Sequence, residues 1–151
     1  MWTSTIRLGF LALLLSICAP HALAQDDGPT LAQRCVARVA EIAENTIDFN
    51  RQVATSTVHS IRVLDNDGAP DRVIIATGKA AKGTINHREQ AAIQRIRNVV
   101  QACVAQLEKN GAPPAAIRAV VRSGHRAVNA IKQSAKHAKG HITRAVIHAT
   151  S

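Results

Sequence analysis

Apolar and small residues recur every three or four positions along most of the chain, from about residue 31 to residue 149. This spacing matches the 3.6-residue turn of an α-helix and places the apolar side chains on one face. Two stretches interrupt the pattern, Asp65–Pro70 (DNDGAP) and Asn110–Pro114 (NGAPP), and both are rich in residues that end helices. The pattern therefore predicts three long helices, over residues 31–64, 71–110 and 114–149, joined by short turns.

The first predicted helix has a clear start. Thr30 stands three residues before Gln33, the spacing of a capping box, in which each side chain bonds to the other residue's free backbone N–H. Steps of four and three residues from Cys35 predict its core positions: Cys35, Val39, Ile42, Thr46, Phe49, Val53, Ser56, Ser60 and Val63.

The second predicted helix has the weakest pattern. Its core positions include polar residues, and Gly78 and Gly83 each weaken a helix by up to ~1 kcal/mol relative to alanine. We therefore allow for a break between residues 77 and 86. The expected core positions of this helix are Ile75, Gly78, Lys82, Ile85, Glu89, Ala92, Ile96, Val99, Cys103 and Gln106.

The third predicted helix has the most regular pattern, with small or aliphatic residues at every core position. These positions are Ile117, Val121, Gly124, Val128, Ile131, Ala135, Ala138, Ile142, Ala145 and Ala149. All seven of its Lys and Arg residues lie outside this series.

Short turns force consecutive helices to lie antiparallel. In a hairpin that turns near residue 69, residues equally distant from the turn face each other, and Cys35 and Cys103 satisfy this condition. The same register places Gly78 opposite Ser60, where it would permit close approach to Ser56 and Ser60. The sequence thus predicts an all-α, antiparallel, up-down-up bundle of three long helices that is cross-linked by one Cys35–Cys103 disulfide.

The first 24 residues have the pattern of a secretory signal peptide. Arg7 supplies a positive charge, Leu8–Ile17 is an apolar run, and Ala22-Leu23-Ala24 is an A-x-A cleavage site. The apolar run is shorter than the ~20 residues that a membrane-spanning helix needs. We therefore expect cleavage between Ala24 and Gln25, a single domain over residues 25–151, and a periplasmic or extracellular location, where disulfides persist.

The charge of the chain is positive and unevenly distributed. Nineteen Lys and Arg face ten Asp and Glu, for a net charge of +9, and residues 110–151 contain no acid at all. Beyond residue 24, Phe49 is the only aromatic side chain, which argues against sugar platforms and base-stacking grooves because both need several rings.

The basic third helix has two interpretations. It is either a solvated face that keeps the protein soluble or a surface that binds polyanions such as nucleic acid or acidic envelope polymers. The absence of acids favours the second interpretation modestly. The residues that would bind the polyanion are Arg118, Arg122, Arg126, Lys132, Lys136, Lys139 and Arg144.

Three histidines raise the question of a metal site. His137 and His141 share a helix face and His148 follows two turns later, a spacing at which imidazoles bind zinc, copper or nickel. No acid or cysteine nearby completes a ligand set, so solvated histidines on a basic face are the favoured interpretation.

No nucleophile–base arrangement, phosphate loop or calcium loop matches its full pattern, so we expect neither an enzyme nor a cofactor. Three hypotheses for function remain. The first is an exported, non-enzymatic bundle with a structural or binding role, including self-association through helix faces. The second is an electrostatic polyanion binder that uses the third helix. The third is a weak histidine metal-binding protein or an enzyme without a recognisable motif.

Overall fold

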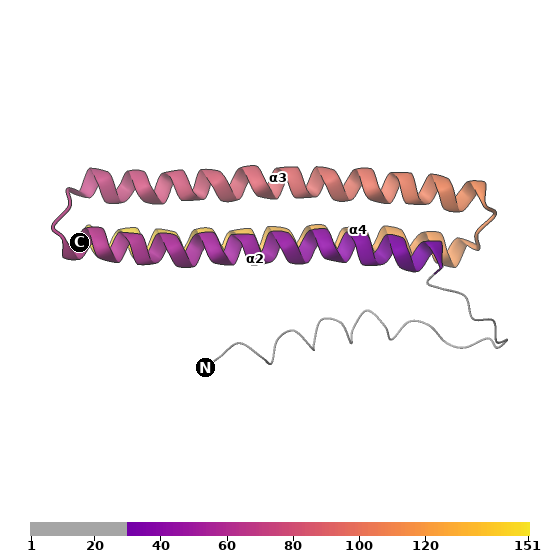
Figure 1. Cartoon of the computed structure of the whole chain (residues 1–151), viewed down its shortest axis with the longest axis horizontal. Coiled ribbons are helices and arrows are strands. Elements are labelled where there is room, and N and C mark those ends of the chain that lie inside the picture. The colour runs from indigo at the N-terminus through magenta and orange to yellow at the C-terminus, as the bar shows by residue number, and fades with distance from the viewer. Residues whose placement is uncertain (1–29) are drawn as a thin grey trace, which may run out of the picture.

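The computed structural model describes residues 30–151, which form three long α-helices and, within that range, no strand. These helices are α2 (Leu31–Asn66), α3 (Asp71–Lys109) and α4 (Pro114–Ala149), and they lie side by side along their whole length (Figure 1). The all-α prediction is confirmed, and each predicted helix end lies within two residues of the observed one. Residues 1–24, the predicted signal peptide with its cleavage site, lie outside the described residues.

The helix ends form where the sequence predicts them. The Thr30 backbone N–H donates to Gln33 Oε1 at 2.7 Å, and the Gln33 backbone N–H donates to Thr30 Oγ1 at 3.3 Å, so the capping box is present. Both turns contain a glycine with a positive φ, 69° at Gly68 and 65° at Gly111. This region of conformational space favours glycine, which explains the sharp reversals after α2 and α3.

Consecutive helices run in opposite directions. Along α4, Gly124 lies against Val100, Lys139 bonds to Glu89, and Val146 lies against Gly78, so partner numbers on α3 fall as numbers on α4 rise. The two turns accordingly lie at opposite ends of the bundle (Figure 1).

The predicted disulfide is present. Cys35 of α2 and Cys103 of α3 are joined, with their Cα atoms 6.2 Å apart. This distance lies within the usual range for disulfides. Cys35 is buried beside Leu107 and Val120, so the bond cross-links the bundle within an apolar cluster at the end where α2 begins.

The buried face of α2 differs from the predicted one in its second half. The buried residues there are Asn50, Ala54, Thr57 and Ile61, each one position after the predicted Phe49, Val53, Ser56 and Ser60. The next buried position after Thr46 lies four residues further along the helix, whereas a strict alternation of four and three predicts three. Such a step shifts the buried face around a 3.6-residue helix by one position. Ser56, Ser60 and Val63 are consequently exposed.

The same type of error occurs at both ends of α3, where Ile74 is buried in place of Ile75 and Leu107 in place of Gln106. The allowed break does not occur, because α3 is continuous through residues 77–86. Gly78 does permit a close approach, but to α4 instead of α2. A Cβ atom added to it would lie 2.5 Å from Cγ2 of Val146 and 3.4 Å from Cγ2 of Ile142.

In α4 the prediction is closest to the structure. Gly124, Ile131, Ala135, Ala138 and Ile142 are all buried as expected, whereas Val120 and Ala127 are buried in place of the predicted Val121 and Val128, which are half-buried. Among residues 30–151, no helix is long and apolar enough to cross a membrane.

Candidate functional site

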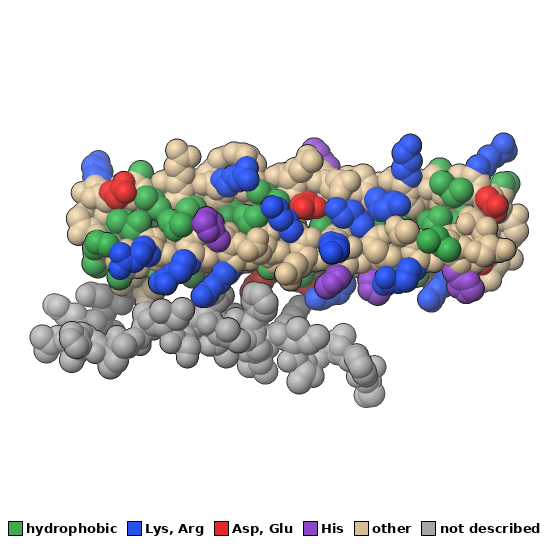
Figure 2. Space-filling model, turned by 180° about the vertical axis from the view of Figure 1, so that it is seen from behind, with side chains coloured by type: hydrophobic (Ala, Val, Ile, Leu, Met, Phe, Trp, Pro, Cys, Tyr) green, Lys and Arg blue, Asp and Glu red, His purple; other side chains and the backbone are tan. Residues whose placement is uncertain are grey.

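The outward face of α4 carries a dense group of cations. Six of its seven Lys and Arg side chains are exposed, and the helix contains no Asp or Glu. Figure 2 views the bundle from the side of α4 and shows blue and purple side chains along the lower edge of the molecule. We call the six exposed residues the basic face: Arg118, Arg122, Arg126, Lys132, Lys136 and Arg144.

The spacing of these residues keeps them on the solvent side. Arg118 and Lys136 are 18 residues apart, five full helical turns, so they project in the same direction with ~27 Å between them along the axis. Arg126 and Arg144 are separated by the same interval. Because none of them falls at a buried position of α4, packing of the bundle leaves all of them accessible.

Lys139, predicted as part of the polyanion surface, has a different role. Its Nζ donates to Asn86 Oδ1 at 2.7 Å and to Glu89 Oε2 at 3.2 Å, both on α3. Its side chain is 30% exposed and that of Glu89 only 18%, so solvent screens this ion pair incompletely. Lys139 therefore joins two helices and has less capacity for an external anion than the basic face.

Few carboxylates neutralise the cations of the bundle. Within residues 30–151 only two ion pairs form, Lys139–Glu89 between helices and Arg51–Asp48 on the surface of α2. The six residues of the basic face thus have no carboxylate within ion-pair distance. Their positive charge is available to a ligand from solution.

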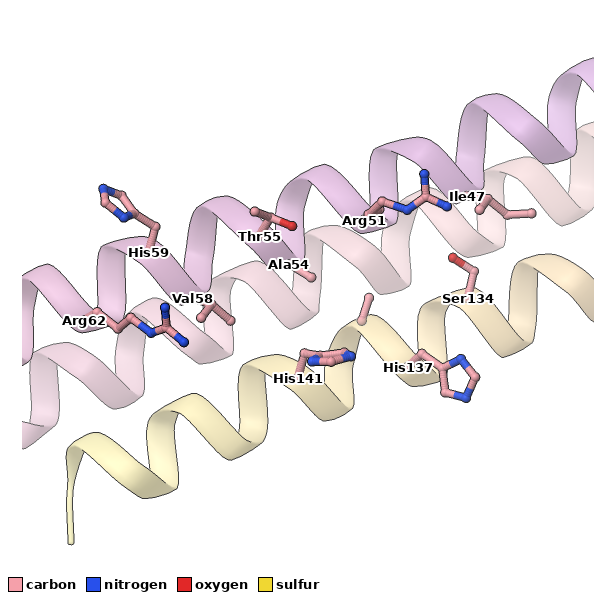
Figure 3. A pocket seen from close by; sticks show the side chains of 11 residues that line it. Ile47, Arg51, Ala54, Thr55, Val58, His59, Arg62, Ser134, His137 and His141 are labelled. Carbon is pink, nitrogen blue, oxygen red and sulfur yellow. The ribbon is translucent and has the colours of Figure 1, made fainter. Parts of the chain in front are cut away.

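A groove of about 620 Å³ runs between α2 and α4, beside the basic face. We call it the α2–α4 groove. Figure 3 shows Val58 and Arg62 of α2 and His141 of α4 extending into the space between the ribbons, whereas His59 projects from the other side of α2. The side chains that line it are Ile47, Arg51, Ala54, Thr55, Val58, His59, Arg62, Ser134, His137, Ala138 and His141.

The structure brings only two of the three predicted metal ligands to this groove. His137 and His141 line it, but His148 does not. Among residues 30–151, no three His, Cys, Asp or Glu side chains are placed to hold a metal ion. The geometry therefore gives no support to a three-histidine site.

Sequence reasoning missed the contribution of α2 to this groove. Arg51, His59 and Arg62 lie on a helix that has equal numbers of acidic residues and of Lys and Arg, and no motif marks them. The repeat of Arg51 and Arg62 at 11 residues, about three helical turns, is the signal that would have placed both on one side of α2.

A second, smaller groove of about 410 Å³ lies between α3 and α4. Only two of the residues that line it are basic or titratable, Arg97 on α3 and His125 on α4. Both grooves therefore lie between α4 and a neighbouring helix, but the α2–α4 groove has more basic residues along it.

Asn50 is fully buried next to the α2–α4 groove. Its Nδ2 donates a long hydrogen bond of 3.4 Å to Ser134 Oγ, and its Oδ1 has no partner. A buried polar group in a helical core usually specifies register at some expense of stability. Here it links α2 to α4 beside a residue that lines the groove.

No protein-family model, no curated protein sequence and no solved structure matches the chain. The functional argument therefore rests on the residues and the geometry described above.

Proposed function

We propose that the protein is an exported, non-enzymatic binding protein whose basic face binds polyanionic polymers, such as nucleic acids or acidic envelope polymers. The observation that carries this proposal is the combination of six exposed cations and no acid on one helix. Electrostatic binding of this kind releases counterions from the polymer and is independent of its sequence.

The shape of the bundle also supports the proposal. Arg118 and Arg144 are separated by 26 residues of straight helix, so the cations extend over ~39 Å and can neutralise many charges of one extended chain. No aromatic residue lies on α4, which favours contacts with backbone charges over stacking on bases. We expect dissociation constants of roughly 1–100 µM at physiological salt, as for other non-specific polyanion complexes.

The test compares two variants of equal net charge on heparin and on double-stranded DNA. The first variant neutralises four residues of the basic face: Arg118→Gln, Arg122→Gln, Lys132→Gln and Lys136→Gln. Each lost phosphate contact lowers the slope of log affinity against log salt by ~0.9, so the slope should fall by as much as about 3–4.

The matched control neutralises four exposed cations of α2 and α3: Arg38→Gln, Arg72→Gln, Lys79→Gln and Arg95→Gln. This control should retain most of the affinity and of the slope. Equal losses in both variants would show that only net charge matters. A wild-type protein that passes through heparin at ~50 mM salt, where such binding is strong, would leave the structural role of the bundle as the remaining hypothesis.

Export is the second part of the proposal. Its support is the order of Arg7, the apolar run Leu8–Ile17 and the Ala22-Leu23-Ala24 site, together with the buried disulfide, which is compatible with an oxidising compartment. The intact mass of the exported protein should be that of a chain whose first residue is Gln25. An exported product that still carries Met1–Ala24 would contradict this.

A further inference from the structure

We propose that the α2–α4 groove is a separate binding site for a single-chain anionic amphiphile, with the acidic head group at the Arg62–His141 end. This site is independent of polymer binding by the basic face. The inference rests on the mixed chemistry of the groove, which has an apolar floor and a cationic rim.

The floor of the groove is largely apolar. Ile47, Ala54 and Val58 of α2 and Ala138 of α4 contribute it, and residues 47 to 58 extend over ~16 Å along the axis. A wholly polar ligand, such as a sulfated polymer, would leave this floor in contact with water. An alkyl chain lying along it gains the hydrophobic contribution of each methylene that it buries.

The rim of the groove is cationic. Arg51, Arg62, His137 and His141 line it and no Asp or Glu does, so charge complementarity selects a ligand with an acidic group. A cationic amphiphile would have no counterpart for its head. The volume of about 620 Å³ lies within the range of small-molecule sites.

The one ion pair of α2 within residues 30–151 indicates the orientation of the ligand. Arg51 already bonds to Asp48 at 3.1 Å, whereas Arg62 has no carboxylate within ion-pair distance in residues 30–151. Arg62 and His141 both extend into the space between α2 and α4 (Figure 3). The acidic head therefore belongs at this end, and the chain runs over Val58 towards Ile47.

The α3–α4 groove provides the internal comparison. It also has an apolar floor, including Val100, Val121 and Val128, but its charge is limited to Arg97 and His125. Two variants, each lacking one arginine and one histidine of one groove, can be compared. The comparison distinguishes an effect of the cationic rim of the α2–α4 groove on binding from an effect of lower net charge.

The first experiment measures binding of a homologous series of alkanesulfonates, kept below the concentrations at which they form micelles, by calorimetry at pH 7.5. Complete burial would raise the affinity ~fourfold per methylene. Because the groove is open on one side, we expect about half of that burial and thus about twofold per methylene. Primary alcohols with alkyl chains of the same length should bind at least tenfold more weakly. An affinity that does not change with chain length would overturn the proposal.

The second experiment uses the matched variants. Arg62→Gln with His141→Gln should lower alkanesulfonate affinity at least tenfold, whereas Arg97→Gln with His125→Gln should change it less than twofold. Val58→Glu, which places an acid on the floor, should abolish binding, and Val63→Glu on the exposed side of the same helix should not. Equal effects in the two groove variants would overturn the assignment.

A third measurement does not depend on the folding of any variant. In methyl NMR spectra of the wild-type protein, the alkanesulfonate should shift Ile47 and Val58 and leave Val121 and Val128 unchanged. Shifts confined to the α3–α4 groove would overturn the proposal. The four-residue variant of the basic face should retain this site, so failure of polymer binding and failure of the groove site are distinguishable.

Discussion

At the scale of single residues, two glycines lie where α3 and α4 contact each other tightly. A Cβ atom at Gly124 would lie 2.7 Å from Cγ2 of Val100, and one at Gly78 would lie 2.5 Å from Cγ2 of Val146. Both neighbours are valines, whose branched side chains have few alternative rotamers. The glycines therefore set how closely α3 and α4 approach, although alanine is the better helix former.

The first prediction follows from this contrast. Gly78→Ala should destabilise the bundle by ~1–2 kcal/mol, because overpacking at a stiff neighbour outweighs the gain in helix propensity. Gly83→Ala, on the same helix with nothing within 4 Å of the added Cβ, should stabilise by up to ~1 kcal/mol. Urea unfolding of the two variants measures the change in the free energy of unfolding, which should have opposite signs. A Gly78→Ala variant as stable as Gly83→Ala would show that α4 shifts freely.

Individual residues also show where sequence reasoning ends. The apolar spacing predicted Val39, Ile42 and Ile131 as core, and each is buried. It placed Phe49 in the core where Asn50 is fully buried, because a periodic series cannot signal a single step of four residues. A buried asparagine contradicts the polarity pattern, so only the packing of α2 against α4 reveals it.

At the scale of elements, α4 divides its surface among four uses. One face is buried in the core, and Lys139 and Thr143 bond to α3 at Glu89 and Lys82. A third side, with His137 and His141, lines the α2–α4 groove, and the remaining side is the basic face. Because the whole helix lacks acids, neither its groove side nor its outer side carries a negative charge.

The disulfide acts between elements, and a prediction belongs to it. It closes a segment of 68 residues that contains the first turn and most of α2 and α3. In the chain-entropy model, a loop of this length stabilises by ~4 kcal/mol. Replacing both cysteines by serine should therefore lower the melting temperature substantially while leaving the helical content unchanged at low temperature.

The control for this prediction is the wild-type protein with and without a reductant. Reduction should shift the melting temperature of the wild type to that of the double variant and should not shift the variant. Free thiols at Cys35 and Cys103 in protein purified from the exported fraction would contradict the disulfide itself.

Element boundaries were largely predictable because each has a local signal. Thr30 and Gln33 form the first cap, and Gly68 and Gly111 adopt the positive φ that the turns require. The rotation of each helix was less predictable, since it depends on all neighbours at once. For this reason the sequence predicted the basic face but not the contribution of Arg51, His59 and Arg62 to the groove.

At the scale of the whole molecule, the charge of the bundle is polarised. Six of the eight acids in residues 30–151 lie between Glu41 and Asp71, which covers most of α2, the turn after it and the first residue of α3. In contrast, α4 has no acid. The side of α4 is positive because its Lys and Arg extend from residue 118 to residue 144 with no acid among them, although α2 lies beside it (Figure 1). Such a field attracts polyanions before any specific contact forms.

The last prediction concerns the response of this field to salt. The six cations of the basic face are exposed and have no carboxylate within ion-pair distance among residues 30–151. Charges on a surface are screened beyond ~8 Å at physiological ionic strength and beyond ~30 Å at ~0.01 M salt. The attraction between the side of α4 and a polyanion should therefore extend much further into solution at low salt.

The association rate of the wild-type protein with heparin, measured by stopped-flow, should fall steeply as salt rises from ~0.01 M to ~0.15 M. The variant with Arg118, Arg122, Lys132 and Lys136 replaced by glutamine should show a weaker dependence on salt than the matched variant of α2 and α3. Equal dependences in the two variants would show that the net charge of the protein, and not the side of α4, produces the attraction.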